Sequence, residues 1–138
     1  MANFERLMRI GGWLAIPALA IGSWTPAEEM VRTGMSGSLE HVIAYLITGF
    51  VFIKGYSERP NWQVASALSG YAAVLEAGQL FAPGRHAGFL EWAASAGGVL
   101  CAVFLANAWR IIKDSTFIGN AHHLKSNADL PLTIGTSR

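Results

Sequence analysis

Residues 87–109 read AGFLEWAASAGGVLCAVFLANAW, and this stretch decides the class of fold. Apart from Glu91 it contains no charged residue. At 1.5 Å per residue, about 20 helical residues cross a hydrocarbon core of roughly 30 Å. Within a bilayer the backbone must hydrogen bond to itself, so an apolar run of this length indicates a membrane-spanning helix.

The rest of the chain has the same character. Of its 138 residues 52% are hydrophobic and 14% are charged, whereas an average soluble domain carries about 25% charged residues. Three further apolar runs cover residues 8–24, 41–53 and 62–81. We therefore predict an all-α fold, a four-helix transmembrane bundle formed by residues 1–113. The net charge of +1 excludes the clustered basic face that nucleic-acid binding requires.

The first apolar run has a rival interpretation as a cleaved signal peptide. Arg6 and Arg9 precede it, and the segment Ala18-Leu19-Ala20 resembles a cleavage site. We interpret the run as a membrane span with a kink at Pro17.

The Lys and Arg residues predict the orientation of the spans, because cytoplasmic loops carry an excess of them. With a cytoplasmic N-terminus, all of the 10 Lys and Arg residues except Arg32 and Arg85 fall on the cytoplasmic side. This predicts an up-down-up-down order with both termini cytoplasmic, in a bacterial cytoplasmic membrane. Residues 114–138 lack an apolar helical pattern, and we expect them to be a polar cytoplasmic tail. Small residues at every fourth position over 65–77 and 94–106 predict close packing of the third and fourth helices.

Polar residues at membrane depth define a candidate site. Ionisable side chains are costly in lipid and face the interior of a bundle or a wet cavity. The predicted topology places Glu40, Glu76 and Glu91 at one level in the outer half of the bilayer, near the turn that carries Arg85. Helical spacing adds polar neighbours on the same helix faces. The candidate residues are Glu40, His41, Tyr45, Glu76, Gln79, Arg85, Glu91 and Ser95.

Two interpretations of these residues stay open. They form either a structural ion-pair network, or a pocket where Arg85 meets an anionic head group. No activated nucleophile and no phosphate-binding loop accompany them, so we assign no catalytic residue and leave an enzymatic role uncertain. We expect no metal and no cofactor, because the paired histidines of a haem site are absent. The single cysteine, Cys101, lies in an apolar run and is expected to be buried and inert.

The order of these motifs resembles the VanZ-like family of small integral membrane proteins. The matching residues are Glu40-His41 with Tyr45, the segment EAGQLF at 76–81, Pro83-Gly84-Arg85, Glu91 and Gly97-Gly98. The family commonly has Asp and then Asn where this chain has Glu91 and Ser95, and a basic residue near the position of Ser38. The resemblance implies a four-span architecture with a polar site on the outer face, and it supplies no reaction.

Three functions follow as expectations. The first is a non-enzymatic accessory or scaffold subunit of a larger membrane assembly, which the spans and residues 114–138 would contact. The second is a binder of an anionic envelope lipid or lipid-like ligand, with an antibiotic-resistance-type role by family analogy. The third is an enzyme acting on a lipid-linked substrate. The expected partners are membrane lipids and that larger assembly.

Overall fold

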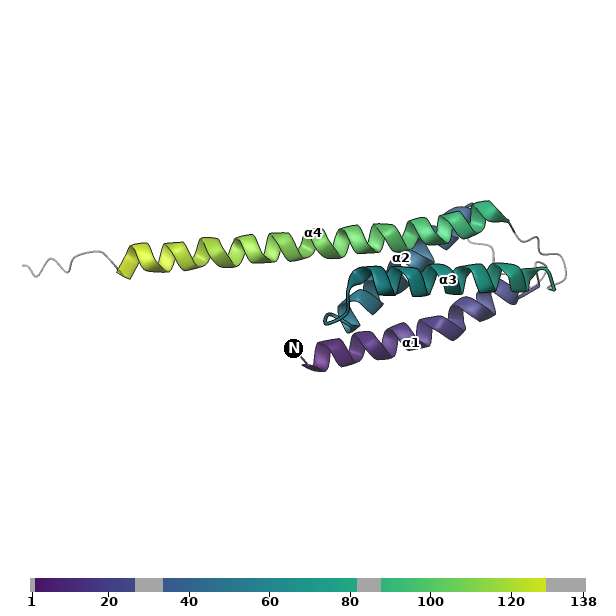
Figure 1. The fold of residues 1–138 in the computed structure, drawn as a ribbon, viewed down its shortest axis with the longest axis horizontal. Helices are drawn as coiled ribbons and strands as arrows, with labels where there is room; N and C mark the ends of the chain where they lie inside the picture. Colours follow the sequence, from purple (N-terminus) through teal and green to yellow (C-terminus); the bar gives the residue numbers. More distant parts are fainter. Residues whose placement is uncertain (1, 27–33, 82–87, 129–138) are drawn as a thin grey trace, which may run out of the picture. The chain divides into compact units, whose positions relative to one another are not determined.

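All four apolar runs are helices in the computed structural model, which describes residues 2–26, 34–81 and 88–128, with side chains as far as residue 115. Helix α1 covers Ala2–Trp24, α2 covers Gly37–Gly55, α3 covers Asn61–Gln79 and α4 covers Phe89–Ala128 (Figure 1). The prediction of an all-α fold is confirmed over these residues.

Three of the described helices are long and apolar enough to cross a membrane. They are α1, α2 and the Phe89–Ser115 part of α4. Helix α3 has the same length as α2, 19 residues, but it is less apolar because it carries Gln63, Ser66, Ser69 and Glu76. The three apolar helices support the prediction that this is a membrane protein.

The chain divides into two units, residues 1–106 and residues 107–138. The first unit holds α1, α2, α3 and the beginning of α4, and it contains all the sites discussed below. In the second unit α4 continues to Ala128, so residues 114–128 of the expected polar tail are helical. A helix that has formed extends at little cost per residue, so it need not end where its apolar pattern ends. Residues 129–138 lie outside the described residues.

Close packing in the first unit joins α4 to α2. A Cβ atom on Gly98 would collide with the carbonyl oxygen of Val42, so only glycine allows this approach of the two backbones. Further along, a Cβ atom on Gly49 would lie 3.0 Å from the Cβ atom of Ala102. The small residues of α4 therefore lie against α2, which the sequence analysis did not predict, while Val64 of α3 also packs against the cluster that Ala102 and Ala106 form with Ile53. On α3, Ala73 and Ala77 are exposed.

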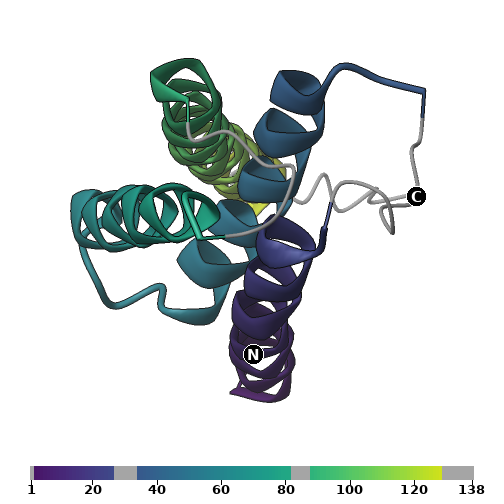
Figure 2. The same cartoon turned by 90° about the vertical axis from the view of Figure 1, so that its right-hand side faces the viewer.

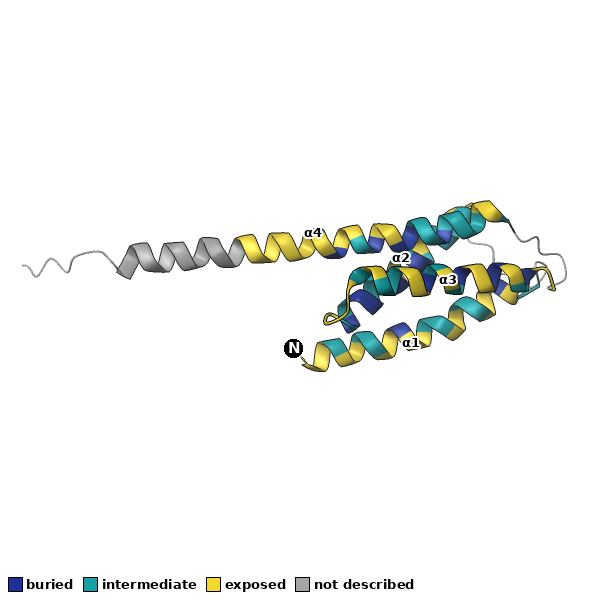
Figure 3. Ribbon diagram, viewed as in Figure 1, coloured by how far each residue is buried: buried dark blue, intermediate teal, exposed yellow. Residues whose placement is uncertain are grey.

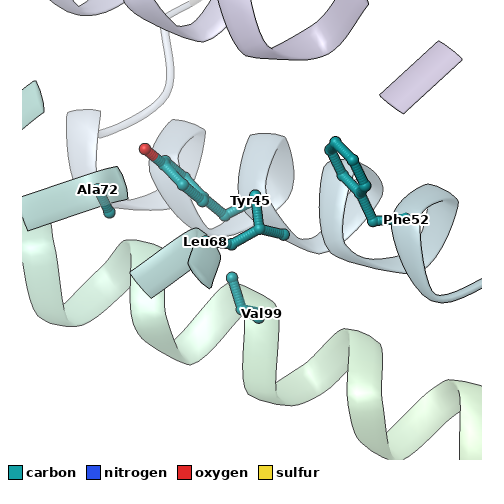
Figure 4. Close-up of a cluster of buried hydrophobic side chains, with 5 residues drawn as sticks. All are labelled: Tyr45, Phe52, Leu68, Ala72 and Val99. Carbon is teal, nitrogen blue, oxygen red and sulfur yellow. The ribbon is translucent and has the colours of Figure 1, made fainter. Parts of the chain in front are cut away.

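Larger side chains fill the centre of this unit. Figure 4 shows Tyr45 and Phe52 from α2 beside Leu68 and Ala72 from α3 and Val99 from α4. All five are buried. Helix α2 therefore contacts both α3 and α4, and Figure 2 views the unit along its helices.

Helix α1 contacts α2 with one half and α3 with the other. Near its N-terminal end the Arg9 Nε donates to the carbonyl oxygen of Gly55 over 2.6 Å, and Phe52 lies against Gly12. Near its C-terminal end the Trp24 Nε1 donates to the carbonyl oxygen of Leu75 over 3.2 Å. The C-terminal ends of α1 and α3 therefore meet.

The outer surface of the unit is apolar, as lipid contact requires. Leu7, Leu14 and Ile21 of α1 and Phe104 of α4 are more than half exposed. Figure 3 shows that exposed positions follow the outward sides of the helices. Cys101 also belongs to this surface. The expectation that its thiol is buried is wrong, because the neighbouring Ala102 occupies the buried face of α4.

Candidate functional site

Helix α2 supplies a polar stripe that faces the interior. His41, Tyr45 and Thr48 follow one another at helical spacing, and the side chains of Tyr45 and Thr48 are buried. The rings of His41 and Tyr45 are nearly parallel, with 9° between their planes and 6.5 Å between their centroids. The stripe predicted from the sequence is therefore an interior feature of the bundle.

Ser95 of α4 holds the imidazole of His41 in place. The Ser95 hydroxyl donates to the carbonyl oxygen of Glu91 over 3.0 Å, and its Oγ lies 3.1 Å from Nδ1 of His41. Which of these two groups donates to the other depends on the tautomer of His41. In either tautomer the contact links His41 of α2 to Ser95 of α4.

Glu76 of α3 is 8% exposed and is held by a backbone hydrogen bond. Its Oε1 accepts a hydrogen bond of 2.6 Å from the backbone N–H of Gly88, just before α4. The carboxyl group of Glu91 lies beside the same glycine, since a Cβ atom on Gly88 would be 3.6 Å from its Oε2. The carboxyl groups of Glu76 and Glu91 therefore gather around the backbone of Gly88.

Gln79 joins α3 to α1. It is 1% exposed, and its Nε2 donates to the Oγ of Ser23 over 2.8 Å. A buried amide that lacks a partner costs roughly 1–3 kcal/mol, so this bond fixes the end of α3 against α1. The adjacent indole of Trp24 lies over Gly78, where a Cβ atom would come within 2.5 Å of Nε1.

These polar side chains adjoin a cavity of about 490 Å³ between α1 and α2. Its apolar walls are Ala15, Ala18 and Leu19 of α1 with Ala44 and Ile47 of α2. Its polar lining is Ser23, Glu40, His41, Tyr45, Thr48 and Glu91. Volumes of about 300–1,000 Å³ with apolar walls and a few convergent polar groups are typical of small-molecule sites.

The structure gathers seven of the eight candidate residues in one region. Four of them line the cavity: Glu40, His41, Tyr45 and Glu91. Gln79 and Ser95 lie behind the lining and hydrogen bond to Ser23 and His41, which form part of it, and Glu76 hydrogen bonds to the backbone N–H of Gly88. Arg85, which both interpretations used as the cation of the site, lies outside the described residues.

The contribution of α1 escaped the sequence analysis. Ala15, Ala18, Gly22 and Ser23 line the cavity, although the site was expected among the second, third and fourth helices. A signal was available, because Ala15, Ala18 and Gly22 are small residues at helical spacing. Gly88 was also missed, since a backbone N–H donor has no side-chain signature.

The arrangement is suited to holding a polar head group beside an apolar chain. The cavity lining combines hydrogen-bonding groups, among them Glu40, His41 and Glu91, with alanine and leucine side chains of α1. Within the described ranges, no three His, Cys, Asp or Glu side chains converge on a metal-sized site.

The comparisons with known proteins identify no relative. No family model matches this chain, and neither a curated protein nor a solved structure matches it. Its class is therefore defined by the helical fold and the three apolar helices alone.

Proposed function

We propose that this chain is a membrane protein that binds a lipid-like amphiphile in the cavity between α1 and α2. The observation that carries the proposal is the composition of that cavity, whose lining combines apolar walls with several polar side chains. A ligand with an apolar chain and a polar head satisfies both parts of the lining.

The proposal includes four spans with both termini cytoplasmic, in an up-down-up-down order. Helix α3 is as long as α2 and lies beside α1, since the Tyr71 hydroxyl donates to the carbonyl oxygen of Ile16 over 2.8 Å. If α1 and α2 cross the bilayer, α3 crosses with them. Membership in the VanZ-like family and a bacterial cytoplasmic membrane stay predictions that rest on the sequence motifs.

The described lining favours a head group that donates hydrogen bonds or carries a positive charge. Glu40 and Glu91 line the cavity, and Glu76 lies directly behind. Carboxylates at membrane depth are stabilised by a cationic partner, and an amine head group supplies one. The anionic head group expected from the sequence depends on Arg85 and becomes the alternative outcome of the test.

The test is photolabelling of the full chain in phosphatidylcholine nanodiscs. Two probes share one alkyl-diazirine chain and differ in the head group, an amine or a phosphate. We expect the amine probe to label α1 and α2 peptides at the cavity, and Ala44→Phe, which fills the cavity, to reduce this labelling about tenfold. Ala73→Phe is the matched control, because Ala73 is exposed on α3 and does not line the cavity.

Each outcome of this test decides the proposal. Preferential labelling by the phosphate probe would replace the amine head group by the anionic one. Equal labelling of wild type and Ala44→Phe by both probes would contradict binding in the cavity, provided that circular dichroism shows both variants to be folded.

An accessory subunit of a larger membrane assembly is the second candidate function. Gly70, Ala73 and Ala77 form an exposed face of small residues on α3, with no neighbouring atom within 4 Å of a Cβ atom on Gly70. Small residues let helices approach closely in lipid. Replacing Gly70 by Leu should then release a co-purifying protein in mild detergent, and unchanged co-purification would count against this role.

A further inference from the structure

A second cavity lies at the opposite end of the first unit, away from the proposed amphiphile site. It has a volume of about 450 Å³ and is lined by residues of α1, α2 and α3 and of the turn between α2 and α3. Its apolar walls are partly aliphatic and partly aromatic, and the aromatic residues are Trp13, Phe52, Tyr56 and Tyr71. Nothing in the proposed function uses it.

Hydrogen bonds and ring contacts fix these walls. The Trp13 Nε1 donates to the Tyr56 hydroxyl over 2.9 Å, and the Trp13 ring meets the Phe52 ring edge-on at 5.9 Å. The Arg9 guanidinium lies 4.8 Å above the Tyr56 ring. The cavity is therefore a preformed space, which lowers the cost of ordering a bound chain.

The polar edge of this cavity is basic. Arg59 lines it, and the backbone N–H of Arg59 bonds to the carbonyl oxygen of Tyr56 over 2.9 Å, which holds the residue at the end of α2. The neighbouring Glu58 is already paired with Arg9 over 3.0 Å. The described basic residues of this end are Arg6, Arg9, Lys54 and Arg59, against the acidic Glu5 and Glu58.

We propose that this cavity binds one anionic phospholipid, with its phosphate at Arg59 and an acyl chain along α3. From Gln63 to Tyr71 the lining extends about 12 Å at 1.5 Å per residue, enough for most of an acyl chain. Basic pockets between membrane helices bind anionic head groups, and aromatic and aliphatic walls suit the chain. An anionic phospholipid fits both the Arg59 edge and the apolar interior.

Native mass spectrometry of the full chain tests this proposal. Delipidated protein is given an equimolar mixture of phosphatidylglycerol and phosphatidylcholine, and the bound lipids are counted. We expect a preference for phosphatidylglycerol that falls about fivefold in Arg59→Gln. Arg6→Gln is the matched control, since it removes the same charge from the same end and does not line the cavity; its preference should fall less than twofold.

A second variant tests the apolar part. Ala67→Phe fills the cavity from an exposed position and should lower the occupancy of both lipids while the helicity stays unchanged. Equal losses in Arg59→Gln and Arg6→Gln would overturn the proposal in favour of general charge attraction. Undiminished binding in both Arg59→Gln and Ala67→Phe would overturn it altogether.

Discussion

Ser95 illustrates how one small side chain organises the polar interior. It bonds both to the carbonyl oxygen of Glu91 and to the ring of His41. Replacing Ser95 by Ala should leave His41 without this partner. We expect the free energy of unfolding to fall by about 1 kcal/mol, and labelling by the amine probe to fall about fivefold. Denaturation in mixed micelles followed by circular dichroism measures the first effect.

Ser66→Ala is the control for this prediction, because Ser66 is exposed on the same bundle and should tolerate the change. If Ser95→Ala kept full stability and full labelling, the proposed role of the His41–Ser95 bond would be wrong.

Much of the polar cluster was predictable at the level of single residues. Glu76 and Glu91 stood out because a carboxyl group in an apolar run needs a polar environment, and helical spacing then added Gln79 and Ser95. Ser23 could not be found in this way, since its role is to accept a hydrogen bond from Gln79, 56 positions further along the chain. The partner of Glu76 was likewise not predictable, because it is the backbone N–H of Gly88.

Between elements, the contact of α2 with α4 depends on Gly98. A methyl group at this position collides with backbone atoms of α2, which cannot rotate away as a side chain would. Gly98→Ala should therefore lower the free energy of unfolding by about 2 kcal/mol, within the usual cost of overpacking. Thermal and denaturant unfolding in the same micelles measure the change.

The next residue provides the matched control. A Cβ atom on Gly97 would have no atom within 4 Å, so Gly97→Ala should be neutral or raise the free energy of unfolding by up to about 1 kcal/mol through better helix propensity. Similar effects of the two substitutions would mean that the helices do not meet at Gly98.

The existence of the helices was predictable, but only part of their pairing was. Apolar runs fix where a chain can cross lipid, and all four runs are helical. A small residue shows only that some neighbour comes close, and it carries no information about which helix that neighbour belongs to. For this reason the stripe through Ala102 was assigned to α3 alone, although Ala102 packs against Gly49 of α2 and belongs to a cluster that Val64 of α3 also contacts.

For the whole molecule, the proposed orientation makes a prediction about its loops. In a chain with Cys101→Ala, single cysteines replace Ser36, before α2, or Ser57, after α2. We expect a membrane-impermeant maleimide to react with position 36 from outside intact cells, and with position 57 only after permeabilisation. Reaction at both positions from the same side would show that α2 does not cross the bilayer.

The extent of α4 was the least predictable property of the whole chain. Composition separates residues 114–138 from the spans, yet the helix continues to Ala128. Polar sequence marks where lipid contact ends, and it does not mark where backbone hydrogen bonding ends. In this chain the apolar run therefore ends at a different residue from the helix that contains it.

The way α1 is fastened has a consequence for what the chain can accommodate. One half of this helix is tied to α2 through Arg9, and the other half is tied to α3 through Ser23 and Trp24. The stretch from Ala15 to Gly22 covers the cavity from between these two attachments. The Tyr71 hydroxyl also holds the carbonyl oxygen of Ile16, so α1 is supported at its middle as well as near its ends. Substitution of Arg9, Trp24 or Tyr71 is therefore expected to change the width of the cavity, although none of these three residues lines it.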